Sequence, residues 1–276
     1  MTFRFSKMHS LGNDFVIIDG VNQALSMDAS LAARVADRKR GIGCDQILIA
    51  EVSNDPEIDF RFRIFNADGS ESAQCGNGAR CFARFLRDQQ LTQKSSIAVS
   101  TTNTTMQLNI ELPDYVRVNM GAPVFEHPRI PFREGIEGHI QPLRVGDQSL
   151  EFGVVSMGNP HAVLQVEDTA TAAVHEIGAE VESHPQFPQR TNVGFMQVSD
   201  RQHIRLRVFE RGVGETEACG SGACAAVVSG ITRGLLSNSV QVRLPGGEVR
   251  VEWEGGQSPV ILSGDAVHVF DGEFRS

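Results

Sequence analysis

The alternation of apolar and polar residues along the chain predicts a fold built mainly from short strands. Apolar residues take every second position over much of 58–66, and continuous apolar runs at 15–18 and 47–50 are typical of buried strands. Further short strands are expected at 3–8, 97–100, 104–112, 116–120, 152–155, 162–166, 193–197, 203–209, 240–244, 248–253, 261–263 and 267–270.

Helical periodicity is limited to a few stretches between these strands. Asp28 is a suitable N-cap for the first of them, because its carboxylate can accept a hydrogen bond from the first turn. The expected helices cover 29–38, 79–89, a segment that starts within 169–175, and a segment from 219–223 to about 232. The mixture of elements predicts an α/β (α+β) fold.

One short phrase occurs twice in the chain. Cys-Gly-x-Gly-Ala stands at 75–79 and again at 219–223, a shift of 144 residues. The same shift places 61–65 on 205–209, and a shift of 146 places Ser-x-Gly-Asn at 10–13 on 156–159. Because the order is the same in each half, the sequence predicts two similar halves, with the Gly- and Pro-rich stretch 121–146 as the crossover between domains.

The two cysteines of this phrase each precede a predicted helix. A helix start favours a thiolate, because its unpaired N–H groups and its dipole attract negative charge. If the halves pack with pseudo-two-fold symmetry, Cys75 and Cys219 face one cleft. One thiolate can then remove an α-proton while the opposite thiol delivers a proton to the other face, without a cofactor. The N–H groups expected to bind the substrate carboxylate belong to Gly76, Asn77, Gly220 and Ser221.

Composition narrows the possible partners. A net charge of −9 argues against nucleic acid, and the apolar runs are too short to span a membrane. The N-terminus lacks a signal-peptide pattern, so we expect a cytoplasmic protein. Five cysteines, an odd number, fit reduced thiols better than disulfides. Their spacing is unlike that of zinc sites, and no metal is expected.

Other residues of the repeat have a structural interpretation. Cys81 and Cys224 lie one turn inside their helices and are interpreted as buried small hydrophobic side chains. The arginines of the two repeated strands are interpreted as a solvated face: Arg61, Arg63, Arg205 and Arg207.

Five segments of the chain together resemble the diaminopimelate epimerase family. They are 7–15, 66–71, 75–81, 156–161 and 215–224. The resemblance implies an isomerase that interconverts LL- and meso-2,6-diaminopimelate in lysine and peptidoglycan precursor synthesis. It implies no pyridoxal phosphate or other cofactor, and a homodimer. It also implies two pseudo-symmetric domains, 1–119 plus 265–276 and 120–264, each a curved, mostly antiparallel sheet or barrel around a central helix. From its place near the C-terminus, Phe270 is a candidate for the contact between the subunits.

The resemblance also implies residue roles. Cys75 and Cys219 match the two catalytic bases, and His161 and Glu210 match groups that tune the pKa of the thiols. Arg211 suits the distal carboxylate of diaminopimelate because its guanidinium can bind through two parallel hydrogen bonds. The positions that match substrate contacts are Asn13, Gln46, Asn66, Gly76, Asn77, Asn159, Asn192, Glu210, Arg211, Gly220 and Ser221.

Two alternatives remain open at this stage. Another cofactor-independent racemase, of the proline racemase type, would share the cysteine phrases, although Arg211 and the asparagines argue against a substrate without a distal charged group. A non-catalytic, redox-sensing amino-acid-binding module would join the two cysteines in a disulfide. Two positions also depart from the family or vary within it. Ser10 stands where the family usually has glycine, and Cys44 lies at a position that varies.

Overall fold

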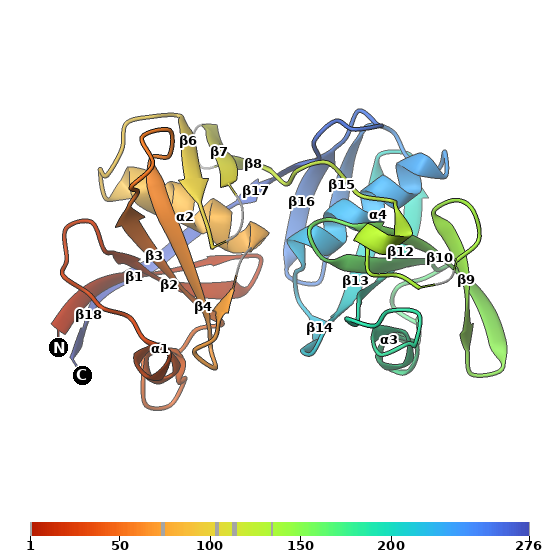
Figure 1. Ribbon diagram of the computed structural model, residues 1–276, viewed down its shortest axis with the longest axis horizontal. Helices are drawn as coiled ribbons and strands as arrows, with labels where there is room; N and C mark the ends of the chain where they lie inside the picture. The colour runs from red at the N-terminus through yellow and green to blue at the C-terminus, as the bar shows by residue number, and fades with distance from the viewer. Residues whose placement is uncertain (1, 73–74, 103–104, 112–114, 134, 276) are drawn as a thin grey trace. The chain divides into compact units, whose positions relative to one another are not determined.

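A computed structural model of the chain describes residues 2–72, 75–102, 105–111, 115–133 and 135–275. The chain divides into two compact units. The N-terminal unit comprises Met1–Asn119 and Ser263–Ser276, and the C-terminal unit comprises Met120–Leu262. Each unit combines a large, mostly antiparallel sheet with two α-helices, which confirms the expected α/β fold class (Figure 1).

The N-terminal unit is a sheet wrapped around one helix. Its strands are β1 (Thr2–Ser10), β2 (Asn13–Asp19), β3 (Gln46–Val52), β4 (Phe60–Asn66), β5 (Glu71–Ser72), β6 (Ser96–Ser100), β7 (Thr105–Glu111), β8 (Tyr115–Asn119) and β18 (Val267–Arg275). They pair in the order β18-β1-β2-β3-β4-β6-β7-β8, with β5 added to β4. Helix α2 (Gly76–Asp88) packs against β1, β2, β3, β7 and β8, whereas α1 (Ala29–Ala36) lies outside against β3 and β4 (Figure 1).

The C-terminal unit repeats this arrangement. Its strands are β9 (Ile140–Val145), β10 (Gln148–Ser156), β11 (Pro160–Gln165), β12 (Asn192–Asp200), β13 (His203–Glu210), β14 (Gly214–Thr216), β15 (Ser239–Leu244) and β16 (Gly247–Glu252). They pair in the order β9-β10-β11-β12-β13-β15-β16, with β14 added to β13. Helix α4 (Gly220–Thr232) is central, α3 (Val174–Glu182) lies outside, a 3-10 turn covers His127–Arg129, and β17 (Ile261–Asp265) leads into the N-terminal unit.

The register confirms the internal repeat predicted from the sequence. Helices α2 and α4 start at Gly76 and Gly220, which are 144 residues apart. The parallel pairs β2–β3 and β11–β12 place Phe15 beside Gln46 and His161 beside Asn192, each 146 residues from its counterpart. The two units therefore hold equivalent residues at equivalent places within their own sheets.

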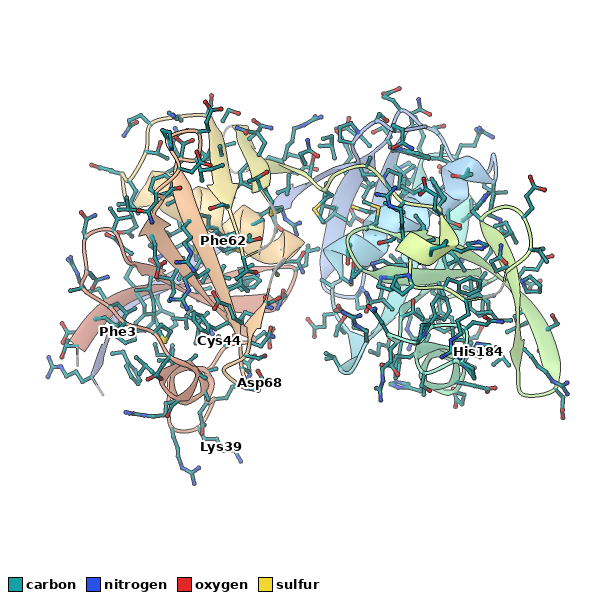
Figure 2. All side chains as sticks on the ribbon, in the orientation of Figure 1. Phe3, Lys39, Cys44, Phe62, Asp68 and His184 are labelled. Atoms are coloured by element: carbon teal, nitrogen blue, oxygen red, sulfur yellow. The ribbon has the colours of Figure 1, made fainter. Side chains whose placement is uncertain are left out.

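The two central helices, α2 and α4, pack against their sheets through side chains of different size. In the N-terminal unit, Phe62 lies on β4 (labelled in Figure 2), and its ring stacks on that of Phe82 of α2, with ring centroids 4.1 Å apart. In the C-terminal unit α4 carries small buried residues instead, and the sheet approaches closely. A Cβ added at Gly153 of β10 would lie 2.0 Å from the Ser229 Oγ of α4, so glycine is required there.

Two element predictions need correction. The stretch 121–146, predicted as a connector, also contains β9; its Pro142 is tolerated because β9 pairs with β10 alone among the described strands. Helix α3 begins at Val174, within the predicted range 169–175, and the Thr169 N–H and hydroxyl both bond the Gln197 side chain before it. Helix α2 begins at Gly76 rather than at 79. The end residues of the predicted strand 104–112 lie outside the described residues.

The predicted solvated face holds for Arg61 and Arg205, which are exposed, but the side chains of Arg63 and Arg207 are only 19% and 25% exposed. Arg63 pairs with Glu71, and Arg207 pairs with Glu215 through two parallel hydrogen bonds of 2.6 and 2.8 Å. These equivalent ion pairs join β4 to β5 and β13 to β14, directly before each cysteine phrase. Among the described residues, no helix is long and apolar enough to cross a membrane.

Candidate active site

Cys75 occupies the N-cap of helix α2. Its backbone is extended, with φ −152° and ψ 108°, and its Sγ accepts a hydrogen bond from the Gly78 N–H at 3.2 Å. A Cβ added at Gly78 would lie 3.2 Å from this sulfur, so the glycine lets the thiol lie over the first turn. The side chain is half-buried. Local sequence thus places a partly accessible thiol at the positive end of a helix.

Amide side chains surround the start of α2. The Asn77 Nδ2 donates to the Asn13 Oδ1 at 3.3 Å, and the Asn13 Nδ2 donates to Asp45 at 2.8 Å. At the ends of β3 and β4, the Gln46 Nε2 donates to the Asn66 Oδ1 at 2.9 Å. The Gln46 Oε1 is buried without a hydrogen-bond partner in the described structure. Since buried acceptors are normally paired, this atom is available to a ligand ammonium group.

Arg80, one turn inside α2, orients the side chain of Asn77. Its fully buried guanidinium donates to the Asn77 Oδ1 at 2.9 Å and to the Ser10 Oγ at 2.6 Å. Ser10 in turn donates to the Asp265 carbonyl at 2.9 Å. Because the Asn77 oxygen is engaged by Arg80, the Asn77 Nδ2 is directed to Asn13. Ser10 is therefore part of the hydrogen-bond network that orients Arg80 and, through it, Asn77. It stands at a position where glycine was expected from the resemblance.

The position of Asn13 depends on a cluster of charged side chains. The Asp14 carboxylate binds Arg38 through two hydrogen bonds and also binds Lys7. Burial opposes ionisation, but the bonds from Arg38 and Lys7 hold the pKa of Asp14 well below its usual range. Arg38 also pairs with Asp45, which accepts from Asn13. The position of Asn13 is thus fixed through Asp45, which Arg38 joins to Asp14.

Cys219 occupies the equivalent N-cap of α4 but is more buried. It is extended, with φ −129° and ψ 106°, 5% exposed, and its Sγ lies 3.7 Å from the Ser221 Oγ. Burial raises the pKa of the Cys219 thiol well above its usual value, and the Glu210 carboxylate raises it further. Hydrogen bonds from Ser221 and Gly222 act in the opposite direction but do not prevail. For Cys219, burial therefore opposes the thiolate that the start of the helix favours.

His161, on strand β11 of the same unit, is fully buried. Burial, together with the positive charge of Arg211, lowers the pKa of His161 to about 3. Its Nε2 lies 3.0 Å from the Asn159 Oδ1, which only accepts, so Nε2 carries the hydrogen. The Nδ1 is then a buried acceptor without a partner in the described structure. A neutral His161 next to Asn192 can receive a hydrogen bond but cannot supply a charge.

Glu210 and Arg211 end strand β13 and begin the turn to β14. The Thr216 hydroxyl donates to the Glu210 Oε1 at 2.6 Å, which fixes one carboxylate oxygen. The Arg211 N–H donates to the Asn192 Oδ1 at 2.8 Å, and its Nη1 donates to the Gln189 carbonyl at 3.1 Å. Arg211 is exposed. Its remaining guanidinium N–H groups suit a carboxylate ligand.

The remaining cysteines are structural. Cys81 and Cys224 are fully buried, as predicted, and burial raises the pKa of Cys81. Burial also raises the pKa of Cys44 to about 12. All five cysteines are reduced thiols in the structure. In the described part of the chain, no group of three or more His, Cys, Asp or Glu side chains is arranged to hold a metal ion.

The predicted site residues therefore gather into two half-sites, one in each unit. Cys75 lies with Asn13, Gln46, Asn66, Gly76 and Asn77, and Cys219 lies with Asn159, His161, Asn192, Glu210, Arg211, Gly220 and Ser221. Sequence reasoning missed Arg80 and Asp45, which orient Asn77 and Asn13. The repeat offered one signal for Arg80. The equivalent position in the second half is Cys224, so a charged residue stands where the other helix has a small apolar one.

Comparison with solved structures defines the class of fold. A phenazine biosynthesis protein of the PhzF family from Bacillus anthracis aligns with a TM-score of 0.72 and 18% identity over 100% of both chains. A hydroxyproline epimerase from Agrobacterium vitis aligns with 0.70 and 15% identity over 99% of this chain and 92% of its own. A predicted epimerase from Pseudomonas aeruginosa aligns with 0.72 and 17% identity over 99% of both. The fold is that of the two-domain epimerases and their relatives.

A family model narrows this class. The model described as Diaminopimelate epimerase matches residues 5–126 and 153–269, one match in each half of the duplicated chain. The chain belongs to the diaminopimelate epimerase family, whose members are isomerases that act on small molecules.

Proposed function

We propose that the protein is a cofactor-independent epimerase that interconverts LL- and meso-2,6-diaminopimelate, in lysine and peptidoglycan precursor synthesis. The observation that carries the proposal is the equivalence of Cys75 and Cys219. Each is the N-cap of the central helix of its own unit, and each is followed by backbone N–H groups at the helix start. A duplicated thiol is what inversion by two opposed bases requires.

The proposed mechanism uses one thiolate and one thiol on a single α-carbon. The N–H groups of Gly76, Asn77, Gly220 and Ser221 hold the substrate carboxylate and stabilise the negative charge that develops on it. The thiolate removes the α-proton, and the opposite thiol protonates the resulting carbanion from the other face. We assign the base to Cys75, which is half-buried and accepts a hydrogen bond from the Gly78 N–H, and the proton donor to Cys219, which is 5% exposed and whose pKa is raised by burial.

The polar groups of the C-terminal half-site support the choice of substrate. Diaminopimelate carries an ammonium and a carboxylate at each end, so a specific site must bind a distal charged pair. Arg211 and Asn192 are joined by a hydrogen bond of 2.8 Å and offer donors and an acceptor for such a pair. Proline and hydroxyproline have no distal pair, and both would leave these groups unsatisfied.

Substitution of individual cysteines tests the proposal. Cys75→Ala and Cys219→Ala should each abolish epimerisation of diaminopimelate, measured by chiral chromatography of the product. Cys81→Ala and Cys224→Ala are matched controls, because each removes a buried thiol from the same helix without touching its N-cap. The proposal fails if either N-cap variant keeps normal turnover, or if the wild-type protein inverts proline or hydroxyproline but not diaminopimelate.

We also propose that the protein is a homodimer that uses strand β18. Phe270 and Val269 are large apolar residues that are 47% and 52% exposed on this strand, and the Phe270 ring also contacts Phe5. Exposed neighbouring apolar side chains are typical of subunit contacts. Phe270→Asp should convert a dimer to a monomer in light scattering, whereas a wild-type monomer would exclude this arrangement.

A further inference from the structure

Glu182, the last residue of α3, has a buried carboxylate outside the two half-sites. Its side chain is 7% exposed, whereas that of its partner Arg190 is 60% exposed. The Glu182 Oε1 accepts from the Gly212 N–H at 2.9 Å and from the Arg190 Nη1 at 3.2 Å. The Glu182 Oε2 also lies 3.4 Å from the Arg190 Nη1. A buried carboxylate with this arrangement joins two segments far apart in the sequence.

Those two segments carry residues proposed to bind the distal end of the substrate. Gly212 directly follows Arg211, and Arg190 lies two residues before Asn192. A backbone hydrogen bond also joins the end of α3 to the loop that contains Arg190: the Thr191 N–H donates to the Glu182 carbonyl at 3.1 Å. The end of α3 therefore holds both loops at once.

The conformation of the first loop shows why such a link is needed. Arg190 has a φ of +60°, a left-handed conformation that is unfavourable for residues other than glycine. Such a residue persists when its surroundings hold it in place. The ion pair with Glu182 supplies that restraint, and the Gln189 carbonyl, which accepts from the Arg211 Nη1, depends on the same loop.

We infer that Glu182 is a positioning residue that sets the geometry of Arg211 and Asn192 for the distal charged pair of the substrate. It touches neither the reacting carbon nor the thiols, and it acts through the two loops that it joins. This inference rests on the proposed function, because it concerns the binding of the end of diaminopimelate that does not react.

The test is a change in KM without an equal change in kcat. Glu182→Gln removes the charge and leaves one acceptor where a carboxylate offers two. We expect KM for diaminopimelate to rise about tenfold, the factor that corresponds to weakening one charge-assisted hydrogen bond, with kcat within about twofold of wild type. Glu180→Gln is the matched control, because the Glu180 carboxylate on the same helix also accepts from a glycine N–H, that of Gly146 at 2.7 Å. It should leave KM unchanged.

A double variant separates positioning from general damage. If Glu182 acts through Arg211, then Glu182→Gln added to Arg211→Ala should raise KM by less than about twofold beyond Arg211→Ala alone. Arg190→Gln breaks the ion pair from its exposed side and should reproduce the rise in KM if Glu182→Gln does not fold. The inference is overturned if KM is unchanged, if kcat falls as much as KM rises, or if the two effects multiply. Inactive wild-type protein would instead refute the proposed function, and this inference with it.

Discussion

The buried histidine of the C-terminal half-site gives the protein a predictable dependence of stability on pH. His161 is fully buried, and its pKa is lowered from 6.5 to about 3, first by burial and then by the charge of Arg211. The unfolded chain binds a proton on this imidazole below about pH 6.5, whereas the folded chain binds it only near pH 3. Because the unfolded state holds more protons across this window, stability is complete above pH 6.5 and is lost as the pH falls.

The size of the effect follows from the two pKa values. Between pH 7 and pH 5, proton binding to the unfolded imidazole lowers the free energy of unfolding by about 2 kcal/mol. Over the whole window down to pH 3 the loss reaches about 4 kcal/mol. Water does not screen the charge of this imidazole in the folded protein, because the side chain has no exposed surface, so the free-energy difference is taken in full.

The measurement compares wild type with His161→Gln, in which a neutral amide keeps one donor and one acceptor. Urea unfolding at pH 7 and pH 5 gives the free energy of unfolding of each protein. Wild type should lose about 2 kcal/mol more than the variant between these pH values, because the contributions of the other titratable groups cancel in the difference. Equal losses in the two proteins would refute the assignment of a neutral, buried His161.

Two further substitutions probe the packing around the half-sites. Gly222→Ala would place a Cβ 3.0 Å from the Val208 Cγ2 and 3.2 Å from the Cys219 Sγ. It should cost about 1–3 kcal/mol in thermal unfolding and reduce kcat, and a variant with normal kcat would show that the thiol tolerates displacement. Ser10→Ala removes the hydroxyl that accepts from Arg80 and donates to the Asp265 carbonyl. It should lower the free energy of unfolding by about 2 kcal/mol in a urea titration, and an unchanged midpoint would contradict the network.

Local patterns in the sequence predicted the duplicated fold and the two cysteine positions well. The repeat places α2 and α4 at a constant shift because each helix start uses the same compact phrase, in which the second glycine, three residues after the cysteine, leaves room for the sulfur. Strand β9 was missed because Pro142 is typical of a connector, and only pairing along a single edge makes a proline acceptable there.

Features that depend on distant contacts were beyond the sequence. Arg80 orients Asn77, which lies three residues before it on the same helix. The position of the Arg80 guanidinium, however, depends on Ser10 and the Asp265 carbonyl, which are 70 and 185 residues away and which no local pattern identifies as its partners. The state of Cys219 shows the same limit, since a helix start is visible in the sequence but the burial that opposes it is not. Glu182 was overlooked because its two partners come from separate loops.

The central claim is that two thiols of different units act on opposite faces of one α-carbon. The most direct test starts from LL-diaminopimelate in deuterium oxide and follows the α-position of substrate and product by mass spectrometry at low conversion. Two bases predict that newly formed meso product carries solvent deuterium, while the unreacted LL substrate keeps its α-proton. Meso product that retains the original proton would show that a single base serves both faces and would contradict the account.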